Sequence, residues 1–179
     1  WQDIVRIYKD PGLPWLFTTA FLIMGAFVSI YNYLGFRLSE SPYDLGPAAI
    51  GAIFLLYALG SASSALAGHL VDRYGRSTIM LGMIGAMAIG VLATLDTRLG
   101  VIITGLALFT FGYFATHAIA SGWVGARAGE RRGLVSALYL SSYYLGSSFL
   151  GSTSGPLWTH FAWPGMVAGL MLCVSLVFG

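Results

Sequence analysis

The chain has 179 residues and a formal net charge of +2; 57% of its residues are hydrophobic and only 9% are charged. Soluble domains carry about 25% charged residues, so this composition excludes an ordinary soluble fold and indicates an apolar surface that faces lipid. The small net charge and the absence of a basic run argue against nucleic-acid binding, and the single Cys173 excludes an intrachain disulfide or a cysteine metal cluster.

Residues 1–10 are predicted to form a short amphipathic helix on the cytoplasmic membrane surface. Its apolar side chains share one helical face, which would consist of Trp1, Ile4, Val5 and Tyr8. Pro11 and Pro14 separate this segment from the first apolar run. We therefore expect a linker helix over 1–10 and a single transmembrane domain over 11–179.

The charges gather in clusters, and long uncharged runs lie between them. A helix that crosses a bilayer needs about 20 apolar residues. The last run, 133–179, has 47 uncharged residues, and two prolines and two tryptophans between 156 and 165 indicate an interfacial turn within it. The sequence thus predicts six transmembrane helices, at about 14–36, 46–71, 77–95, 99–126, 133–156 and 162–179.

The basic residues predict the orientation, because Lys and Arg prefer the cytoplasmic side. With six spans, the N-terminal segment and the second and fourth loops hold seven of the nine basic residues. We expect a multi-pass protein of the cell inner (plasma) membrane with both termini cytoplasmic. The chain begins without Met and ends inside an apolar run, so we also expect it to be part of a longer protein.

The two halves of the sequence resemble each other weakly. Gly25, Phe27 and Ser29 match Gly112, Phe114 and Thr116 at an offset of 87 residues, and Leu59-Gly60-Ser61 matches Leu145-Gly146-Ser147 at 86. Three helices per copy would place the second copy upside down in the membrane. The expected fold class is therefore an all-α membrane protein whose six transmembrane helices form a 3+3 inverted repeat.

Residues 68–76 read GHLVDRYGR and fall between the second and third predicted spans. Gly68 permits close helix approach, Asp72 suits a positive helix N-terminus, and Gly75 permits a tight turn. Arg73 and Arg76 can pair with acids or lipid phosphates. This pattern, at this place, resembles the cytoplasmic-loop signature of the major facilitator superfamily; a charged turn with helix caps is the alternative interpretation.

The resemblance implies one half of a larger transporter. The family has twelve helices in two six-helix halves, and it uses this motif to stabilise one access state. Residues 31–35, 116–123 and 139–146 also resemble the drug/proton-antiporter-like branch. The implied protein is the C-terminal half of a secondary active transporter that moves a small molecule by alternating access, with proton-coupled efflux. The implied partners are the N-terminal six-helix half of the same transporter, the lipid bilayer and a small-molecule substrate, with no cofactor and no metal.

In this family the first and fourth helices of each half line the cavity. His117 is the only ionisable side chain well inside a predicted span, and such residues usually face a bundle interior or water. Tyr139 and Tyr143 share a helical face by their i, i+4 spacing. The candidate cavity residues are Tyr31, Asn32, His117, Ser121, Tyr139 and Tyr143. Packing between helices is the alternative for each, and His117 could carry protons or be a neutral, hydrogen-bonded side chain.

Two other functions are weighed against transport. An intramembrane serine protease would need a base beside its nucleophile, but the serines of 151–155 are followed by His160 in the next turn, and His117 is on another helix. We therefore predict no catalytic residues. The second alternative is a self-associating six-helix membrane protein without the parent's transport activity, and the isolated chain is expected to expose its cavity face and to pair.

Overall fold

A computed structural model describes residues 2–177, and the regular elements among them are all helical. This confirms the prediction of an all-helical protein. The elements are α1 (Gln2–Tyr8), α2 (Leu13–Ser39), α3 (Pro47–Ile53), η1 (Phe54–Ala58), α4 (Leu59–Tyr74), α5 (Arg76–Ala93), α6 (Leu99–Arg127), η2 (Gly129–Arg131), α7 (Arg132–Thr153) and α8 (Gly155–Leu176).

Five helical segments among residues 2–177 are long and apolar enough to cross a membrane: α2, the continuous segment Pro47–Tyr74, α5, α6 and α8. The sequence predicts six spans. The segment that falls outside this set is α7, which has 22 residues but carries many serine and tyrosine hydroxyls that lower its mean hydropathy. The span predicted over 133–156 therefore stays a prediction, although a helix of suitable length forms there.

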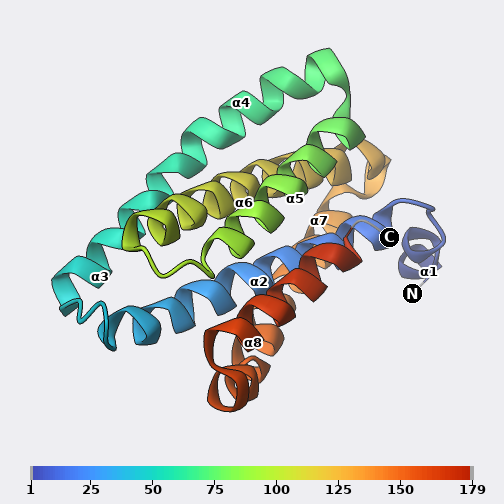
Figure 1. Ribbon diagram of the computed structural model, residues 1–179. Helices are drawn as coiled ribbons and strands as arrows, with labels where there is room; N and C mark the ends of the chain where they lie inside the picture. Colours follow the sequence, from blue (N-terminus) through green and yellow to red (C-terminus); the bar gives the residue numbers. More distant parts are fainter. Residues whose placement is uncertain (1, 178–179) are drawn as a thin grey trace.

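The interior of the bundle is built by α2 and α6 (Figure 1). The apolar stretch of α2 is 67% buried and that of α6 is 50% buried, against 17% for the segment that contains α4. α2 packs along α7, and α6 packs against both α5 and α4. α2 also contacts α6 and α8, so these two helices connect every other long helix.

Two glycines allow the closest helix approaches. A methyl group at Gly146 of α7 would overlap the main-chain carbonyl of Phe21 in α2, and one at Gly112 of α6 would overlap the carbonyl of Met83 in α5. Small residues at such contacts let two backbones touch, which is how membrane helices gain packing energy when lipid is as apolar as leucine. The α2–α7 and α5–α6 pairs therefore depend on these positions.

The second predicted span, 46–71, is observed as three consecutive helices, α3, η1 and α4. Gly46 and Pro47 begin it, as expected for proline at the first turn of a helix. The central piece, η1, is a 3-10 helix of five residues. At the other end, Gly75 has a φ of +84°, which a residue with a side chain adopts only under strain, and it separates α4 from α5.

The turn predicted over 156–165 is narrower than expected. The chain stays helical from Gly155 onward, and the break is confined to Ala162, whose φ of +50° kinks α8. Pro164 follows the break and cannot donate a main-chain hydrogen bond across it. Of the last predicted span, 162–179, the final two residues lie outside the described part of the chain.

The linker helix α1 packs on the bundle through a side chain outside the face predicted to lie on the membrane surface, and the role of that face stays a prediction. Ile7 is buried, with 4% exposure, whereas Val5 and Tyr8 of the predicted face are 40% and 53% exposed. Trp1, the fourth member of that face, lies outside the described residues. Asp3 of α1 accepts a hydrogen bond from Arg131 of η2 at 2.7 Å, which joins α1 to the segment that follows α6.

Candidate functional site

A group of aromatic side chains gathers where α2, η1, α6 and α7 meet. Four of its ring pairs have centroids no more than 5.0 Å apart: Phe27 with Tyr113 at 3.9 Å, His117 with Tyr143 at 4.8 Å, Tyr31 with Tyr57 at 4.9 Å, and Phe27 with Tyr31 at 5.0 Å. We call this group the aromatic cluster, and it consists of Phe27, Tyr31, Tyr57, Tyr113, Phe114, His117, Tyr139 and Tyr143.

Helical spacing explains why these rings converge. α2, α6 and α7 each carry two cluster members four residues apart, so each such pair lies on one face of its helix, and Phe114 of α6 follows directly after Tyr113. Those pairs are 27 and 31, 113 and 117, and 139 and 143. The three faces meet in the interior, since α6 contacts both α2 and α7.

Three side-chain hydrogen bonds hold the cluster together. The hydroxyls of Tyr31 and Thr110 lie 2.8 Å apart and join α2 to α6. The hydroxyls of Tyr113 and Tyr143 lie 2.7 Å apart, and the Tyr139 hydroxyl lies 3.1 Å from His117 Nδ1, so two further bonds join α6 to α7. Polar groups inside a membrane protein need such partners because hydrocarbon offers none.

Four of the six predicted cavity residues meet in this cluster: Tyr31, His117, Tyr139 and Tyr143. Asn32 and Ser121 do not. Asn32 is exposed on α2, one residue and about 100° around the helix from Tyr31, so it faces away. Ser121 is exposed, and its hydroxyl donates to the main-chain oxygen of Ala118 at 3.1 Å rather than to His117.

The prediction omitted several members of the cluster. Tyr113 lies four residues before His117 and could have been found by that spacing. Tyr57 lies in η1, where a 3-10 turn changes the direction of side chains in a way that helical spacing does not predict. Thr110 has an ordinary side chain for a membrane helix, and only the contact with Tyr31 distinguishes it.

The chemistry of the cluster suits a ligand with aromatic or cationic groups and a few hydrogen-bonding atoms. Ring faces attract cations and stack on other rings, while hydroxyls and imidazole exchange hydrogen bonds. Tyr57 is 38% exposed, and His117 and Tyr143 are partly exposed, so a ligand can reach them. Within residues 2–177, no three His, Cys, Asp or Glu side chains are grouped to bind a metal ion.

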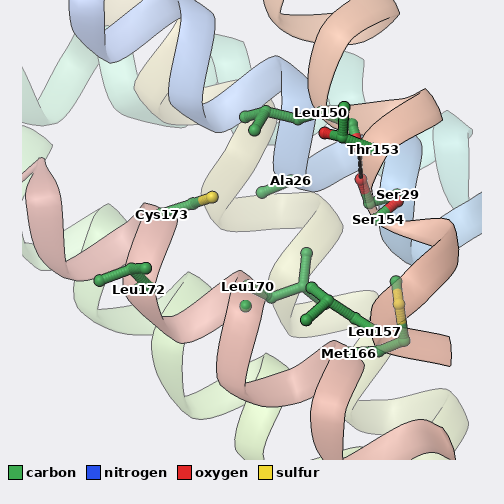
Figure 2. A pocket seen from close by; sticks show the side chains of 11 residues that line it. Ala26, Ser29, Leu150, Thr153, Ser154, Leu157, Met166, Leu170, Leu172 and Cys173 are labelled. Atoms are coloured by element: carbon green, nitrogen blue, oxygen red, sulfur yellow. Dashed lines mark hydrogen bonds between the residues drawn. The ribbon is translucent and has the colours of Figure 1, made fainter. Parts of the chain in front are cut away.

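A separate cavity of about 170 Å³ lies between α2, α7 and α8 (Figure 2). Its walls are largely apolar, with Leu150, Met166 and Leu170 among them. Its hydroxyls are used by the main chain: Ser29 donates to Leu150, Thr153 to Phe149 and Ser154 to Gly151. Because none of the six predicted cavity residues lines it, we regard the aromatic cluster as the candidate site.

The loop motif occupies the end of α4 and the start of α5. A cavity of about 280 Å³ beside it is lined by Gly68, Asp72 and Arg76 together with residues of α6. Gly75 forms the turn, and the Arg73 guanidinium lies 5.2 Å from the centre of the Tyr74 ring. α6 connects the motif to the cluster, because it lines the cavity beside the motif and also carries His117, which contacts Tyr139 of α7.

Comparison with known proteins identifies relatives over nearly the whole chain. The sequence model described as Major Facilitator Superfamily matches residues 1–152. "Inner membrane transport protein YnfM" of Escherichia coli is 45% identical over 174 residues, which are 96% of this chain and 42% of that protein. "Uncharacterized MFS-type transporter YybF" of Bacillus subtilis is 41% identical over 177 residues, 98% of this chain and 44% of that protein. This chain thus spans less than half the length of these relatives.

Proposed function

This chain belongs to the Major Facilitator Superfamily, and from this premise we propose that it is one half of a secondary active transporter that moves a small molecule by alternating access. The observation that carries the proposal is the coverage: two relatives named as transporters match nearly all of this chain with less than half of their own length. The remainder of each relative has room for a second half, as the two-half architecture requires.

We propose further that the chain is the C-terminal half of a proton-coupled efflux transporter of the drug/proton-antiporter-like branch, in the inner membrane. The basic residues support cytoplasmic termini, because the segments that hold seven of the nine lie together. Figure 1 shows α1, the α4–α5 turn and the α6–α7 junction at the same end of the bundle. Lys and Arg at one end of a membrane bundle indicate its cytoplasmic side.

The helix pairs support the proposed 3+3 inverted repeat. An inverted repeat relates each contact between helices of the two triplets to an equivalent contact made by their counterparts. α2 packs along α7, and correspondingly α6 packs along α4. The matched glycines take part in these contacts, since Gly146 meets the main chain of α2 and Gly60 of α4 meets the Phe114 ring of α6.

In the proposed mechanism the aromatic cluster forms this half's share of the substrate cavity. Its hydrogen bonds hold rings from α2, α6 and α7 in one arrangement, so that the second half can close over substrate bound at their exposed edges. Exposed apolar side chains on η1, α4 and α7 would contact that second half; examples are Leu55, Leu66, Leu140, Tyr144 and Leu145, which are 45–75% exposed.

The test separates this proposal from a self-associating six-helix protein. The chain, with an affinity tag, is expressed together with the untagged segment that precedes it in the same reading frame. We expect the two pieces to co-purify in a one-to-one complex and to restore transport. A chain that pairs only with itself, and leaves the preceding segment behind, would support the alternative function instead.

A further inference from the structure

Two arginines make related contacts at opposite ends of the bundle. Arg37 lies near the end of α2, and Arg127 is the last residue of α6. α2 and α6 are the first helices of the two proposed triplets. Each arginine reaches out of its own helix and binds the loop that leads into the other helix.

Arg37 holds the loop between α5 and α6. Its guanidinium donates to the main-chain oxygens of Thr94 and Asp96, the latter at 2.8 Å. The guanidinium also lies 5.1 Å from the centre of the Trp163 ring, and the Trp163 indole donates to the Thr94 hydroxyl at 3.1 Å. This contact therefore consists of carbonyls and aromatic faces, and it joins α2, the start of α6 and α8.

Arg127 holds the loop between α1 and α2. Its Nε donates to the Asp10 carboxylate at 3.0 Å, and the guanidinium packs against Gly12 so closely that a methyl group there would overlap it. The same Asp10 oxygen accepts the main-chain N–H groups of Gly12 and Leu13 at 2.8 and 2.9 Å. This contact is an ion pair at the N-terminus of α2.

The two loops are also equivalent in sequence. Asp10 lies three residues before Leu13, the first residue of α2, and Asp96 lies three residues before Leu99, the first residue of α6. Asp96 accepts the main-chain N–H of Arg98 at 2.8 Å, as Asp10 accepts that of Gly12. The two aspartates are 86 residues apart, which is the offset that relates Leu59-Gly60-Ser61 to its copy.

We propose that Arg37 and Arg127 are equivalent positioning residues that fix the register of α2 against α6 from both ends. The two helices each begin at the point where the other one's arginine binds, so neither can slide or splay without breaking one contact. The cluster contacts between these helices, Tyr31 with Thr110 and Phe27 with Tyr113, require that register. Any consequence of this register for substrate binding at the aromatic cluster rests on the proposed function. The positions of α2 and α6 themselves do not.

The test measures distances between spin labels in the complete transporter, with Cys173→Ser as background. One label pair, at Phe36 and Gly100, reports the end that holds α3; the other, at Thr18 and Ala126, reports the end that holds α1. All four positions are exposed. We expect Arg37→Gln to lengthen or broaden the first distance by about 1.5 Å or more, the rise of one helical residue, and to leave the second unchanged. Arg127→Gln should do the reverse.

Matched controls come from neighbouring arginines that do not join α2 to α6. Arg98→Gln removes a contact with Asp96 within one loop, and Arg131→Gln removes a contact with α1. Neither should move either label pair. The conservative variants distinguish the two chemistries: Arg127→Lys should keep its distance because an ion pair needs only charge, whereas Arg37→Lys should not, since an ammonium cannot bind two carbonyls and stack on Trp163 as a planar guanidinium does.

Two results would overturn the inference. One is unchanged distances in both Arg→Gln variants, which would mean that helix packing alone sets the register. The other is equal broadening at both ends from either variant, which would indicate general loosening rather than local positioning. If the distances respond as expected while transport of every tested compound is unaffected, the positioning role stands and the substrate role of the aromatic cluster fails.

Discussion

The hydrogen bond between His117 and Tyr139 offers a quantitative test of the candidate site. Nδ1 of His117 lies 3.1 Å from the hydroxyl of Tyr139, whose side chain is only 3% exposed. His117→Ala leaves that hydroxyl without its partner inside the bundle. Hydrogen bonds between membrane helices contribute on average about 0.6 kcal/mol and at most about 1.7 kcal/mol. The strong burial of Tyr139 places this bond in the upper part of that range.

A double-mutant cycle isolates this energy. His117→Ala, Tyr139→Phe and the double variant are made in the complete transporter, and unfolding is followed in mixed micelles with increasing SDS. We expect the sum of the losses in unfolding free energy of the two single variants to exceed the loss of the double variant by about 1 kcal/mol. This difference corresponds to roughly a fivefold change in the unfolding equilibrium constant. His160→Ala is the control, because His160 is exposed and should change stability little.

Transport is measured on the same variants as efflux of ethidium from energised cells, a probe chosen for its aromatic and cationic character. We expect His117→Ala to change efflux while most of the protein still folds, and a shift in the pH dependence of efflux would add a proton-carrying role. Additive stability effects, together with unchanged efflux in His117→Ala, would refute the reasoning, because His117 would then be neither coupled to Tyr139 nor part of the cavity.

Three further predictions concern topology, packing and pH. Single cysteines at Ser77 and Ser41, in a cysteine-free background, should label from opposite sides of the membrane; labelling from one side would contradict the six-helix topology. Gly146→Leu should destabilise the protein by about 1–3 kcal/mol in SDS unfolding, because a side chain there overlaps the main chain of α2; an effect no larger than that of Gly122→Leu at an open position would contradict this. Burial alone would raise the pKa of Asp10, but hydrogen bonds from two main-chain N–H groups and from Arg127 hold it below the ordinary value. Its stabilising effect should therefore be complete above about pH 4 and be lost as the pH falls through the lowered pKa, and Asp10→Asn should remove this acid-dependent part of the unfolding curve. Several other charged residues lie at this end, namely Asp3, Arg6, Lys9, Asp72, Arg73, Arg76, Glu130, Arg131 and Arg132. Asp3 and Arg131 form an ion pair, so the comparison is repeated in Arg131→Gln, where the difference should persist.

The charge pattern predicts the bounds of a long helix well where the apolar run forms one uninterrupted α-helix. The span expected over 99–126 is α6, Leu99–Arg127, and the one expected over 77–95 is α5, Arg76–Ala93. Charged residues mark these ends because they remain in water, so the ends can be found without knowing the packing. The division of 46–71 into three helices has no comparable signal, since Phe54–Ala58 is as apolar as its neighbours.

The site is predicted less completely because a sequence does not give the rotation of each helix. His117 stands out as an ionisable residue within a span, and Tyr139 and Tyr143 stand out by their spacing. Asn32 is equally polar but is turned about 100° from Tyr31, so polarity alone does not predict whether a residue joins the cluster. The rotation of α2 is determined by its contacts with α6 and α7, which lie far away in the sequence.

The 3-10 helix η1 has a mechanical consequence for the site, because it carries Tyr57. A 3-10 helix rises about 2.0 Å per residue against about 1.5 Å for an α-helix, so its five residues are stretched by about 2.5 Å. It also turns about 120° per residue rather than about 100°, so relaxation of the whole segment would rotate α3 relative to α4 by about 100°. One local change of helix type would therefore shorten the segment and change the direction of the Tyr57 side chain relative to Tyr31, with the main-chain hydrogen bonds exchanged rather than lost.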